Sequence, residues 1–160
     1  MAQTLNGSYK QNYADSYAVD VGTYRHATGN YNFTDDTGVA AAYTIFTVTG
    51  DVLLSIFGLC QVSCTSGGVA KIELGIVGNT AALAAQTTAT ELIQYEIWED
   101  ATPTIANPGL IDLFGGARQF VVAAGVDIIL TISAANLTAG DIDFHAFWMP
   151  LSADGNLVGN

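Results

Sequence analysis

The C-terminal stretch 127–150 constrains the fold most, because apolar and polar residues alternate in it along two separate runs. The apolar residues that share a face are Ile128, Leu130 and Ile132 in the first run, and Ile142, Phe144 and Trp148 in the second. A period of two is the period of a β-strand that buries one face. Residues 136–140, between the runs, are rich in turn formers. The pattern predicts a β-hairpin around which the rest of the chain packs.

Short strand-like runs dominate the chain before this stretch. The three clearest are Ala42–Thr49, Val52–Val62 and Val69–Val77, which are rich in β-branched and aromatic residues. Because the connections between them are short, we predict an antiparallel meander. The alanine-rich segment 79–90 favours one or two helical turns instead.

Further strands are predicted towards the C-terminus, at Glu91–Trp98, Leu110–Phe114 and Arg118–Ala124. The total of about eight or nine short strands is typical of an all-β protein with an antiparallel β-sandwich. A jelly roll is our first choice of topology and an immunoglobulin-like sandwich our second. Two runs, Val52–Leu59 and Phe120–Ala124, are apolar on both faces. This surplus of apolar surface predicts a homo-oligomer, for which we expect a trimer.

The first 30 residues differ in composition from the rest, since they are polar and poor in aliphatic side chains. They carry four tyrosines, which are Tyr9, Tyr13, Tyr17 and Tyr24. We predict an extended N-terminal arm over residues 1–30 and a single sandwich domain over residues 31–160. Tyrosine suits a docking role because its ring is apolar and its hydroxyl forms hydrogen bonds, so these four are the candidate partner-binding residues. A frayed tail is the alternative.

The charge balance is strongly acidic. Four basic residues oppose fifteen acidic ones, and the formal net charge is -11. Nucleic-acid binding needs clustered Lys and Arg, so we expect no nucleic-acid partner. Attraction to an anionic membrane is disfavoured for the same reason. No apolar run reaches the length of a membrane span, and no secretory signal is visible at the N-terminus.

Catalytic and metal-binding motifs are weak in this chain. Asp141 and Asp143 fall on one strand face about 6.6 Å apart, and His145 continues that face. The trio could serve acid–base chemistry or bind a metal ion, whereas a solvated strand face needs such residues for solubility alone. Neither a G-x-S-x-G elbow nor a glycine-rich phosphate loop occurs. We therefore expect no enzymatic activity, no cofactor and no metal.

Two further sets of residues are candidates for a disulfide or a metal site. Cys60 and Cys64 lie too close in sequence for an easy disulfide, so we predict two reduced thiols. The loop carboxylates Asp35-Asp36 and Glu99-Asp100 could offer oxygen ligands to Ca²⁺, although no EF-hand pattern accompanies them.

Several segments of the central block resemble small structural proteins of tailed bacteriophages. They are D-V-L-L-S-I-F-G-L-C, A-K-I-E-L-G-I-V-G-N-T-A-A-L-A-A-Q-T-T-A-T-E-L, E-I-W-E-D-A-T-P and D-I-D-F-H-A-F-W-M-P-L-S-A-D-G. The resemblance spans roughly residues 50–155. It implies a virion component, such as a capsid decoration (cement) protein, and brings no catalytic residues with it.

The resemblance and the composition together predict a non-enzymatic decoration protein on the exterior of the particle. Its partners would be the major capsid protein or other virion subunits. An acidic protein suits the exterior, because contact with packaged DNA would favour basic residues. The alternative is a receptor- or glycan-binding knob of a tail or head fibre, in which Tyr95 and Trp98 stack on sugars.

Overall fold

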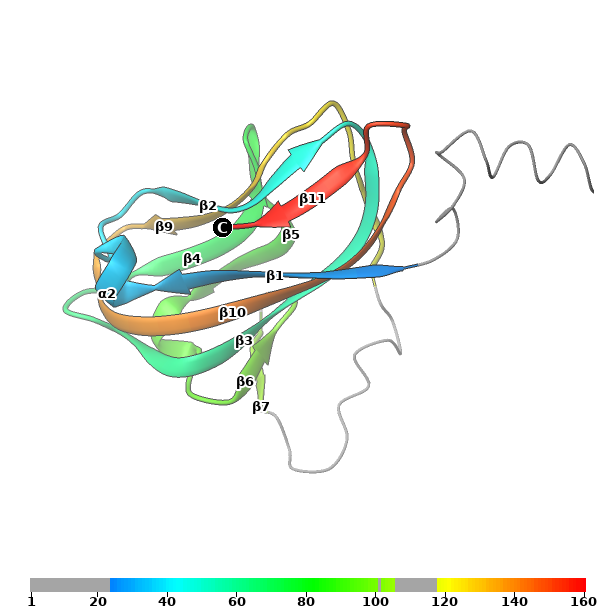
Figure 1. The fold of residues 1–160 in the computed structure, drawn as a ribbon. Coiled ribbons are helices and arrows are strands. Elements are labelled where there is room, and N and C mark those ends of the chain that lie inside the picture. The colour runs from blue at the N-terminus through cyan, green and yellow to red at the C-terminus, as the bar shows by residue number, and fades with distance from the viewer. Residues whose placement is uncertain (1–23, 101, 106–117) are drawn as a thin grey trace, which may run out of the picture.

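The computed structural model describes residues 24–100, 102–105 and 118–160. These residues form two antiparallel β-sheets, here called sheet A and sheet B, that pack face to face (Figure 1). The all-β sandwich predicted from the strand pattern is confirmed. No helix in the described part of the chain is long and apolar enough to cross a membrane.

Sheet A contains six strands among the described residues, in the order β1-β10-β3-β6-β7, with β8 also paired to β3. They are β1 (Arg25–Asn32), β3 (Val52–Ser66), β6 (Glu96–Trp98), β7 (Thr104–Ile105), β8 (Phe120–Val122) and β10 (Leu137–Pro150). The two longest, β3 and β10, pair with each other along most of their length. They therefore form the centre of the sheet, with β1 on one side and β6 and β8 on the other.

Sheet B has the order β11-β2-β9-β4-β5. Its strands are β2 (Ala42–Thr49), β4 (Lys71–Ile76), β5 (Asn79–Thr88), β9 (Ile128–Ser133) and β11 (Asn156–Gly159). The C-terminal residue links the two sheets: the Asn160 amide donates to the Ile45 carbonyl at 3.0 Å, and its carbonyl accepts from the Asn30 amide at 3.2 Å. These bonds close the sandwich along the β1 edge.

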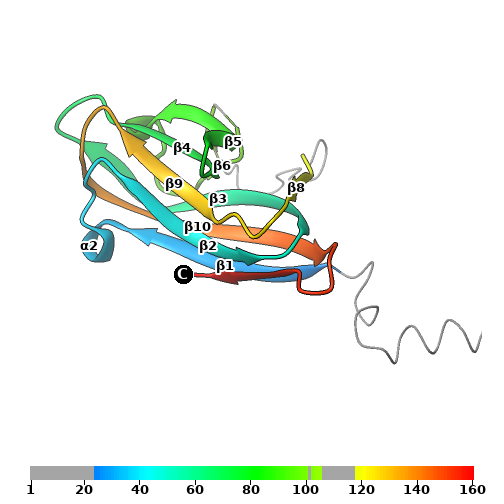
Figure 2. The ribbon, with the colours of Figure 1, turned by 90° about the horizontal axis from the view of Figure 1, so that it is seen from above.

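Strand pairing is nested: β1 pairs with β10, β2 with β9, β3 with β8, and β4 with β5. Consecutive strands from β1 to β4 accordingly alternate between the sheets, and Figure 2 shows sheet B lying over sheet A. The predicted meander of β2, β3 and β4 is therefore wrong. Each strand was recognised from its own residues, but short connections join strands of opposite sheets as readily as neighbours in one sheet.

The predicted C-terminal hairpin is also wrong, because β9 and β10 belong to different sheets. Their connection turns through Ala134, whose φ of 65° lies in the left-handed region. Both strands do bury the face that the alternation indicated, with Leu130 of β9 and Phe144 of β10 fully buried. Alternation shows which face of a strand is buried. It does not show which sheet the strand belongs to, because the inner faces of both sheets of a sandwich have the same alternation.

Residues 79–88 form strand β5 rather than the predicted helical turns. The strand pairs with β4 across a turn at Gly78, whose φ is 91°. Leu83 and Ala84 are buried against the core, so tertiary burial overrides the helix preference of alanine. Among the described residues of this region, the only helical turn is the 3-10 segment η2 (Ala89–Glu91).

A short helix, α2 (Phe33–Asp36), directly follows β1. The Asn32 side chain caps it by accepting from the Thr34 amide at 2.9 Å, and the Asp36 carboxylate accepts from the Asn32 amide at 2.9 Å. The helix ends at Thr37, which adopts the left-handed conformation, followed by Gly38. The turn reverses the chain from β1 into β2.

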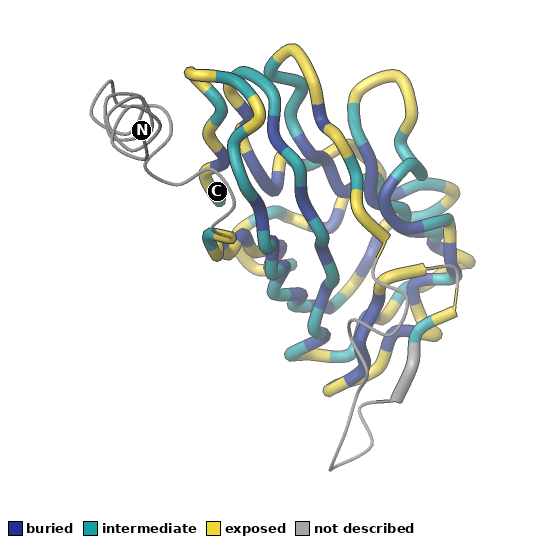
Figure 3. The backbone as a smooth tube through the Cα atoms, turned by 90° about the vertical axis from the view of Figure 1, so that its right-hand side faces the viewer, coloured by how far each residue is buried: buried dark blue, intermediate teal, exposed yellow. Residues whose placement is uncertain are grey.

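The core lies between the sheets, where dark buried positions alternate with outward-facing ones along each strand (Figure 3). Two edge-to-face ring pairs anchor it: Trp98 with Phe144 at 6.3 Å between centroids, and Tyr31 with Tyr43 at 5.2 Å. Such contacts add to the stabilisation from burial.

The sandwich begins earlier than predicted. The expected boundary at Tyr31 falls inside β1, since residues 25–32 all pair with β10. Residues 25–30 therefore belong to the sandwich and not to an arm. Residues 1–23, which hold most of the predicted arm, lie outside the described residues, as does the predicted strand Leu110–Phe114.

Candidate interaction surface

The outward-facing side of β1, β10 and β3, here called the A face, carries most of the candidate functional residues. Its side chains are His26, Thr28 and Asn30 of β1; Asp141, Asp143, His145, Phe147 and Met149 of β10; and Leu53, Ser55, Phe57, Leu59 and Gln61 of β3. All of them are half-buried or exposed, whereas their alternating neighbours on β3 and β10 are buried. The face runs from a polar end at Asp141 to an apolar end at Met149.

The polar end holds the two aspartates that the sequence placed on one strand face. The Asn30 amide nitrogen Nδ2 donates to Asp141 Oδ1 at 2.8 Å and to Asp143 Oδ1 at 2.9 Å. Asn32 Nδ2 donates to Asp141 Oδ2 at 3.0 Å, and Gln61 Nε2 donates to Asp143 Oδ2 at 2.7 Å. All four carboxylate oxygens thus accept a hydrogen bond from an amide, and these bonds hold both side chains in a surface network.

The middle of the A face is a row of stacked rings. His26 lies between Phe147, at 5.0 Å between centroids, and His145, at 5.3 Å. His145 in turn stacks on Phe57 at 5.2 Å. Each histidine ring thus contacts two neighbouring rings of the row.

The two histidines also share a hydrogen bond, with His26 Nε2 and His145 Nδ1 3.1 Å apart. Burial lowers the pKa of His145, and the neighbouring His26 adds to the effect, while Asp143 opposes it. Such a bond requires one nitrogen to donate and the other to accept, so at least one ring carries an unprotonated nitrogen there. Protonation of both histidines would therefore remove the hydrogen bond between them at the centre of the A face.

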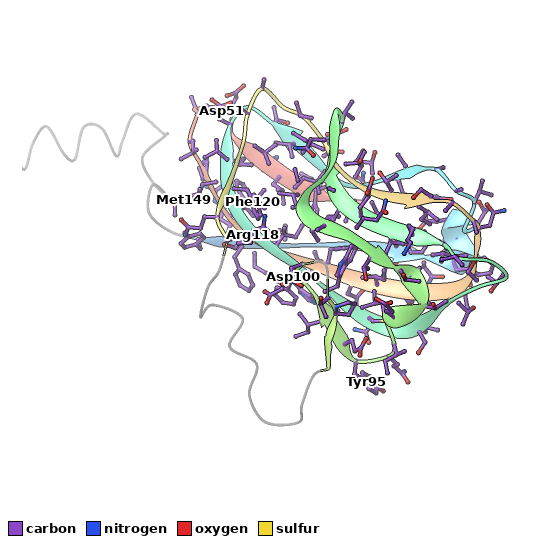
Figure 4. All side chains as sticks on the ribbon, turned by 180° about the vertical axis from the view of Figure 1, so that it is seen from behind. Asp51, Tyr95, Asp100, Arg118, Phe120 and Met149 are labelled. Carbon is purple, nitrogen blue, oxygen red and sulfur yellow. The ribbon has the colours of Figure 1, made fainter. Side chains whose placement is uncertain are left out.

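The apolar end gathers Leu53 and Met149, which pair with each other, beside Phe147. Strand β8 extends it, because Val121 pairs with Leu53 and is 62% exposed. Figure 4 shows Met149, Phe120 and Arg118 at this end of the molecule. The Arg118 guanidinium lies over the Phe120 ring at 5.2 Å, and the Ser55 hydroxyl donates to the Arg118 carbonyl at 3.2 Å.

The outward side of sheet B has a different character. Its central side chains include Thr44, Thr47, Lys71, Glu73 and Thr131, and they are polar. Lys71 Nζ donates to Thr88 Oγ1 at 2.6 Å, and the Glu73 carboxylate accepts from Thr80 and Gln86. A solvated face of this kind is normal for an antiparallel sheet. Of the two outer faces, only the A face thus combines aromatic and aliphatic side chains in one continuous area among the described residues.

The predicted arm residues divide into two groups. Tyr9, Tyr13 and Tyr17 lie outside the described residues, so their partner-binding role stays a prediction. Tyr24 is described and is 45% exposed, and its hydroxyl accepts from Gln119 Nε2 at 2.7 Å. Gln119 directly precedes β8, so this bond joins the start of β1 to the opposite side of the A face.

The cysteines are both free thiols and both buried. The Cys60 thiol donates to the Val62 carbonyl at 3.2 Å. A hydrogen bond between the two sulfurs lowers the pKa of Cys60 and raises that of Cys64, and burial raises the pKa of Cys64 further. Two buried thiols of this kind act as small apolar core residues.

The remaining candidates do not form a site in the described part of the chain. Trp98 is fully buried against Phe144, so it cannot stack on a sugar, while Tyr95 is 61% exposed. Burial raises the pKa of Glu99, and Asp100 next to it contributes to the rise. No group of three or more His, Cys, Asp and Glu side chains that could hold a metal ion occurs among the described residues.

Sequence reasoning found part of this surface. It placed Asp141, Asp143 and His145 on one face, which the structure confirms, but it missed their partners His26 and Asn30. The signal for the apolar end was present in Val52–Leu59, which is apolar on both faces. Alternation on β3 assigns Leu53, Phe57 and Leu59 to the outer side once the inner side is known.

Comparisons with known proteins give one distant likeness. No protein-family model matches the chain, and no curated protein matches it. Among solved structures, a chain of the acidic stable capsid structure of Helicobacter pylori bacteriophage KHP30 is similar, with a TM-score of 0.49 and 8% sequence identity. The match covers 86% of this chain and 94% of that one. A likeness of this degree is too low to assign a function.

Proposed function

We propose that this protein is a non-enzymatic structural component of a tailed-phage virion, and that it decorates the outer surface of the capsid. The observation that carries the proposal is the A face, which is apolar and aromatic while the outer side of sheet B is polar. Half-exposed apolar and aromatic side chains that adjoin one another on a strand face suit a contact with another macromolecule. The resemblance of the central block to phage structural proteins supplies the virion context.

The topology supports this class. We interpret the nested pairing of β1 with β10, β2 with β9, β3 with β8, and β4 with β5 as a jelly roll, since a long hairpin rolled into two sheets produces this order. Jelly rolls are common in viral capsid and lectin domains. The fold is compatible with many functions, so the surface rather than the topology decides between them.

The chemistry of the candidate residues supports a role without catalysis. The carboxylates of Asp141 and Asp143 are held by amide donors from Asn30, Asn32 and Gln61. These hydrogen bonds from three side-chain amides fix both carboxylates in a surface network. The pair is therefore better suited to ordering the polar end of the A face than to proton transfer.

The charge of the protein favours an exterior position. A net charge of -11 is repelled by packaged DNA, whereas it keeps an exposed surface soluble. We propose that the contacts to the major capsid protein or other virion subunits involve the arm tyrosines Tyr9, Tyr13, Tyr17 and Tyr24. We further propose that the copies associate as a trimer. A glycan-binding knob has less support, because Trp98 is buried in the core.

Binding to particles tests the proposal. Purified protein is added to tailed-phage heads that lack it, and its occupancy is measured by sedimentation with the heads. Saturable binding with a fixed number of copies per head is expected. A glycan array run on the same sample provides the contrast. Specific binding to glycans without binding to heads would contradict the proposal and favour the knob.

A further inference from the structure

We propose that the A face is the docking surface for residues 1–23 of a neighbouring copy of this chain. This inference rests on the proposed structural role and names the partner surface of the arm. The bound segment belongs to a second copy of this protein, and its tyrosine rings contact the apolar surface of the strands. Three observations carry the proposal: the composition of the A face, the place where the segment enters the fold, and the composition of the segment.

The A face needs a cover of a particular kind. Its apolar end presents Leu53 and Met149 next to the exposed Val121, and Phe57 follows towards the middle of the face. Its polar end presents the carboxylates of Asp141 and Asp143. A matching segment would carry apolar rings that also form hydrogen bonds, together with little negative charge. Tyrosine meets the first requirement, because it combines a large apolar ring with a hydroxyl group.

Residues 1–23 meet both requirements. They carry Tyr9, Tyr13 and Tyr17, and their formal charge is -1, from Lys10 against Asp15 and Asp20. The whole chain has a formal charge of -11, so nearly all of the negative charge lies outside this segment. Lys10 also supplies one cation for the polar end of the face. Electrostatic repulsion between the segment and another copy is accordingly weak.

The segment is long enough to cover the face. Fully extended, 23 residues reach about 76 Å. The A face from Met149 to Asp141 spans nine residues of β10, or about 27 Å at the rise of an antiparallel strand. An extended run of nine residues, such as Tyr9–Tyr17, would therefore match the length of the face. Residues 18–23 would remain as the connection between copies.

The entry point of β1 directs the segment away from its own A face. β1 starts at Arg25, opposite Trp148, and runs towards Asp141. The chain before it therefore comes from beyond the Met149 end. The bond from Gln119 to the Tyr24 hydroxyl fixes residue 24 at this end of the face. A segment that continues in this direction would leave its own copy and reach the next one, whereas covering its own face would require the chain to reverse before residue 24.

This arrangement is heterologous, because the arm of one copy binds the face of another. Such contacts form a closed ring if the rotation between copies permits it. The proposed trimer would then be a ring of three arms and three A faces. Removal of residues 1–23 is expected to convert the oligomer into a monomer, and light scattering measures that change.

Photo-cross-linking tests the docking site directly. One full-length chain carries p-benzoylphenylalanine in place of Tyr13, and it is mixed with a heavy-isotope-labelled chain that lacks it. Mass spectrometry of the cross-linked peptides is expected to join the segment of the first chain to β3 or β10 of the labelled chain. Cross-links only within one copy, only to sheet B, or to neither sheet would overturn the proposal.

Substitutions on the face provide a second test. The double variant Phe57→Ser/Met149→Ser is expected to weaken association by roughly tenfold or more, because it removes apolar side chains whose burial would favour binding. Val158→Ser is the matched control, since Val158 is an exposed apolar residue of sheet B, and it should leave association unchanged. Equal effects of the two variants would contradict the proposal. If the double variant does not fold, the cross-linking result alone decides.

Failure of this inference can be distinguished from failure of the proposed function. A protein that decorates phage heads but gives no cross-link to the A face would refute only the docking site. A protein that gives the expected cross-link between copies but binds no heads would refute the proposed decoration and leave the docking site supported.

Discussion

Removal of β1 is expected to destabilise the sandwich, whereas removal of the residues before it is not. Two truncated chains isolate the effect: one starts at Tyr24 and keeps β1, and the other starts at Tyr31 and loses residues 25–30. Both lack the N-terminal segment, so their difference reports on residues 24–30, which are Tyr24 and most of β1. In the full chain β1 pairs with β10 along its whole length.

The magnitude follows from what β1 covers. Losing the strand gives up backbone hydrogen bonds of about 1 kcal/mol each, but it also releases about 1–2 kcal/mol of ordering cost per residue. These terms largely offset each other, so apolar burial decides. Arg25 lies over the Trp148 ring at 5.1 Å, and Gly29 lies close against Ile45. If about 150 Å² of such surface becomes exposed, the free energy of unfolding falls by about 4 kcal/mol.

Thermal melting of the two truncated chains at equal concentration measures the difference. For a chain of this size, a loss of about 4 kcal/mol corresponds to a fall in Tm of roughly 8–16 °C. A chain starting at Tyr31 that melts within a degree or two of the chain starting at Tyr24 would refute the reasoning. It would mean that β1 is not part of the cooperative fold.

Three further predictions concern single side chains. Trp98→Ala should lower the free energy of unfolding by about 3–5 kcal/mol in chemical denaturation, because Trp98 is buried. Tyr95→Ala should lower it by about 0.5 kcal/mol or less, because Tyr95 is exposed. Similar losses for the two variants would contradict the placement of Trp98 in the core. Because burial lowers the pKa of His145, the unfolded chain binds more protons near pH 6.5, so stability should fall as the pH drops below that value. His145→Gln should flatten this dependence between pH 7 and 5, and parallel curves for the two proteins would count against it. Cys60 and Cys64 should both react with an alkylating agent after denaturation and neither before it, as intact mass would show; a denatured sample without alkylated cysteine would reveal a disulfide.

The sequence was sufficient to predict several strands, among them β9 and β10 with their buried faces, because alternation depends only on neighbouring residues. Ile128, Leu130, Phe144 and Trp148 were all placed on the correct side. Pairing depends instead on residues far apart in the chain. Asn30 and Asp141 meet across 111 residues. For that reason the sequence predicted a sandwich but assigned β9 and β10 to one hairpin.

The site was predicted in part for the same reason. Asp141, Asp143 and His145 lie two residues apart on one strand, so their common face follows from the strand period. The ring stack requires His26 of β1 beside His145 of β10, which 119 residues separate. In the alanine-rich β5, the local sequence preference predicts the wrong structure. Its local preference is helical, yet pairing with β4 and burial of Leu83 determine its conformation.

The position of the protein on the virion tests the central claim most directly. A cryo-electron microscopy reconstruction of phage heads decorated with the purified protein would locate it. The account predicts density that fits the two-sheet sandwich on the outside of the capsid shell. Density on the inner side of the shell, or heads that bind none of the protein, would contradict the account.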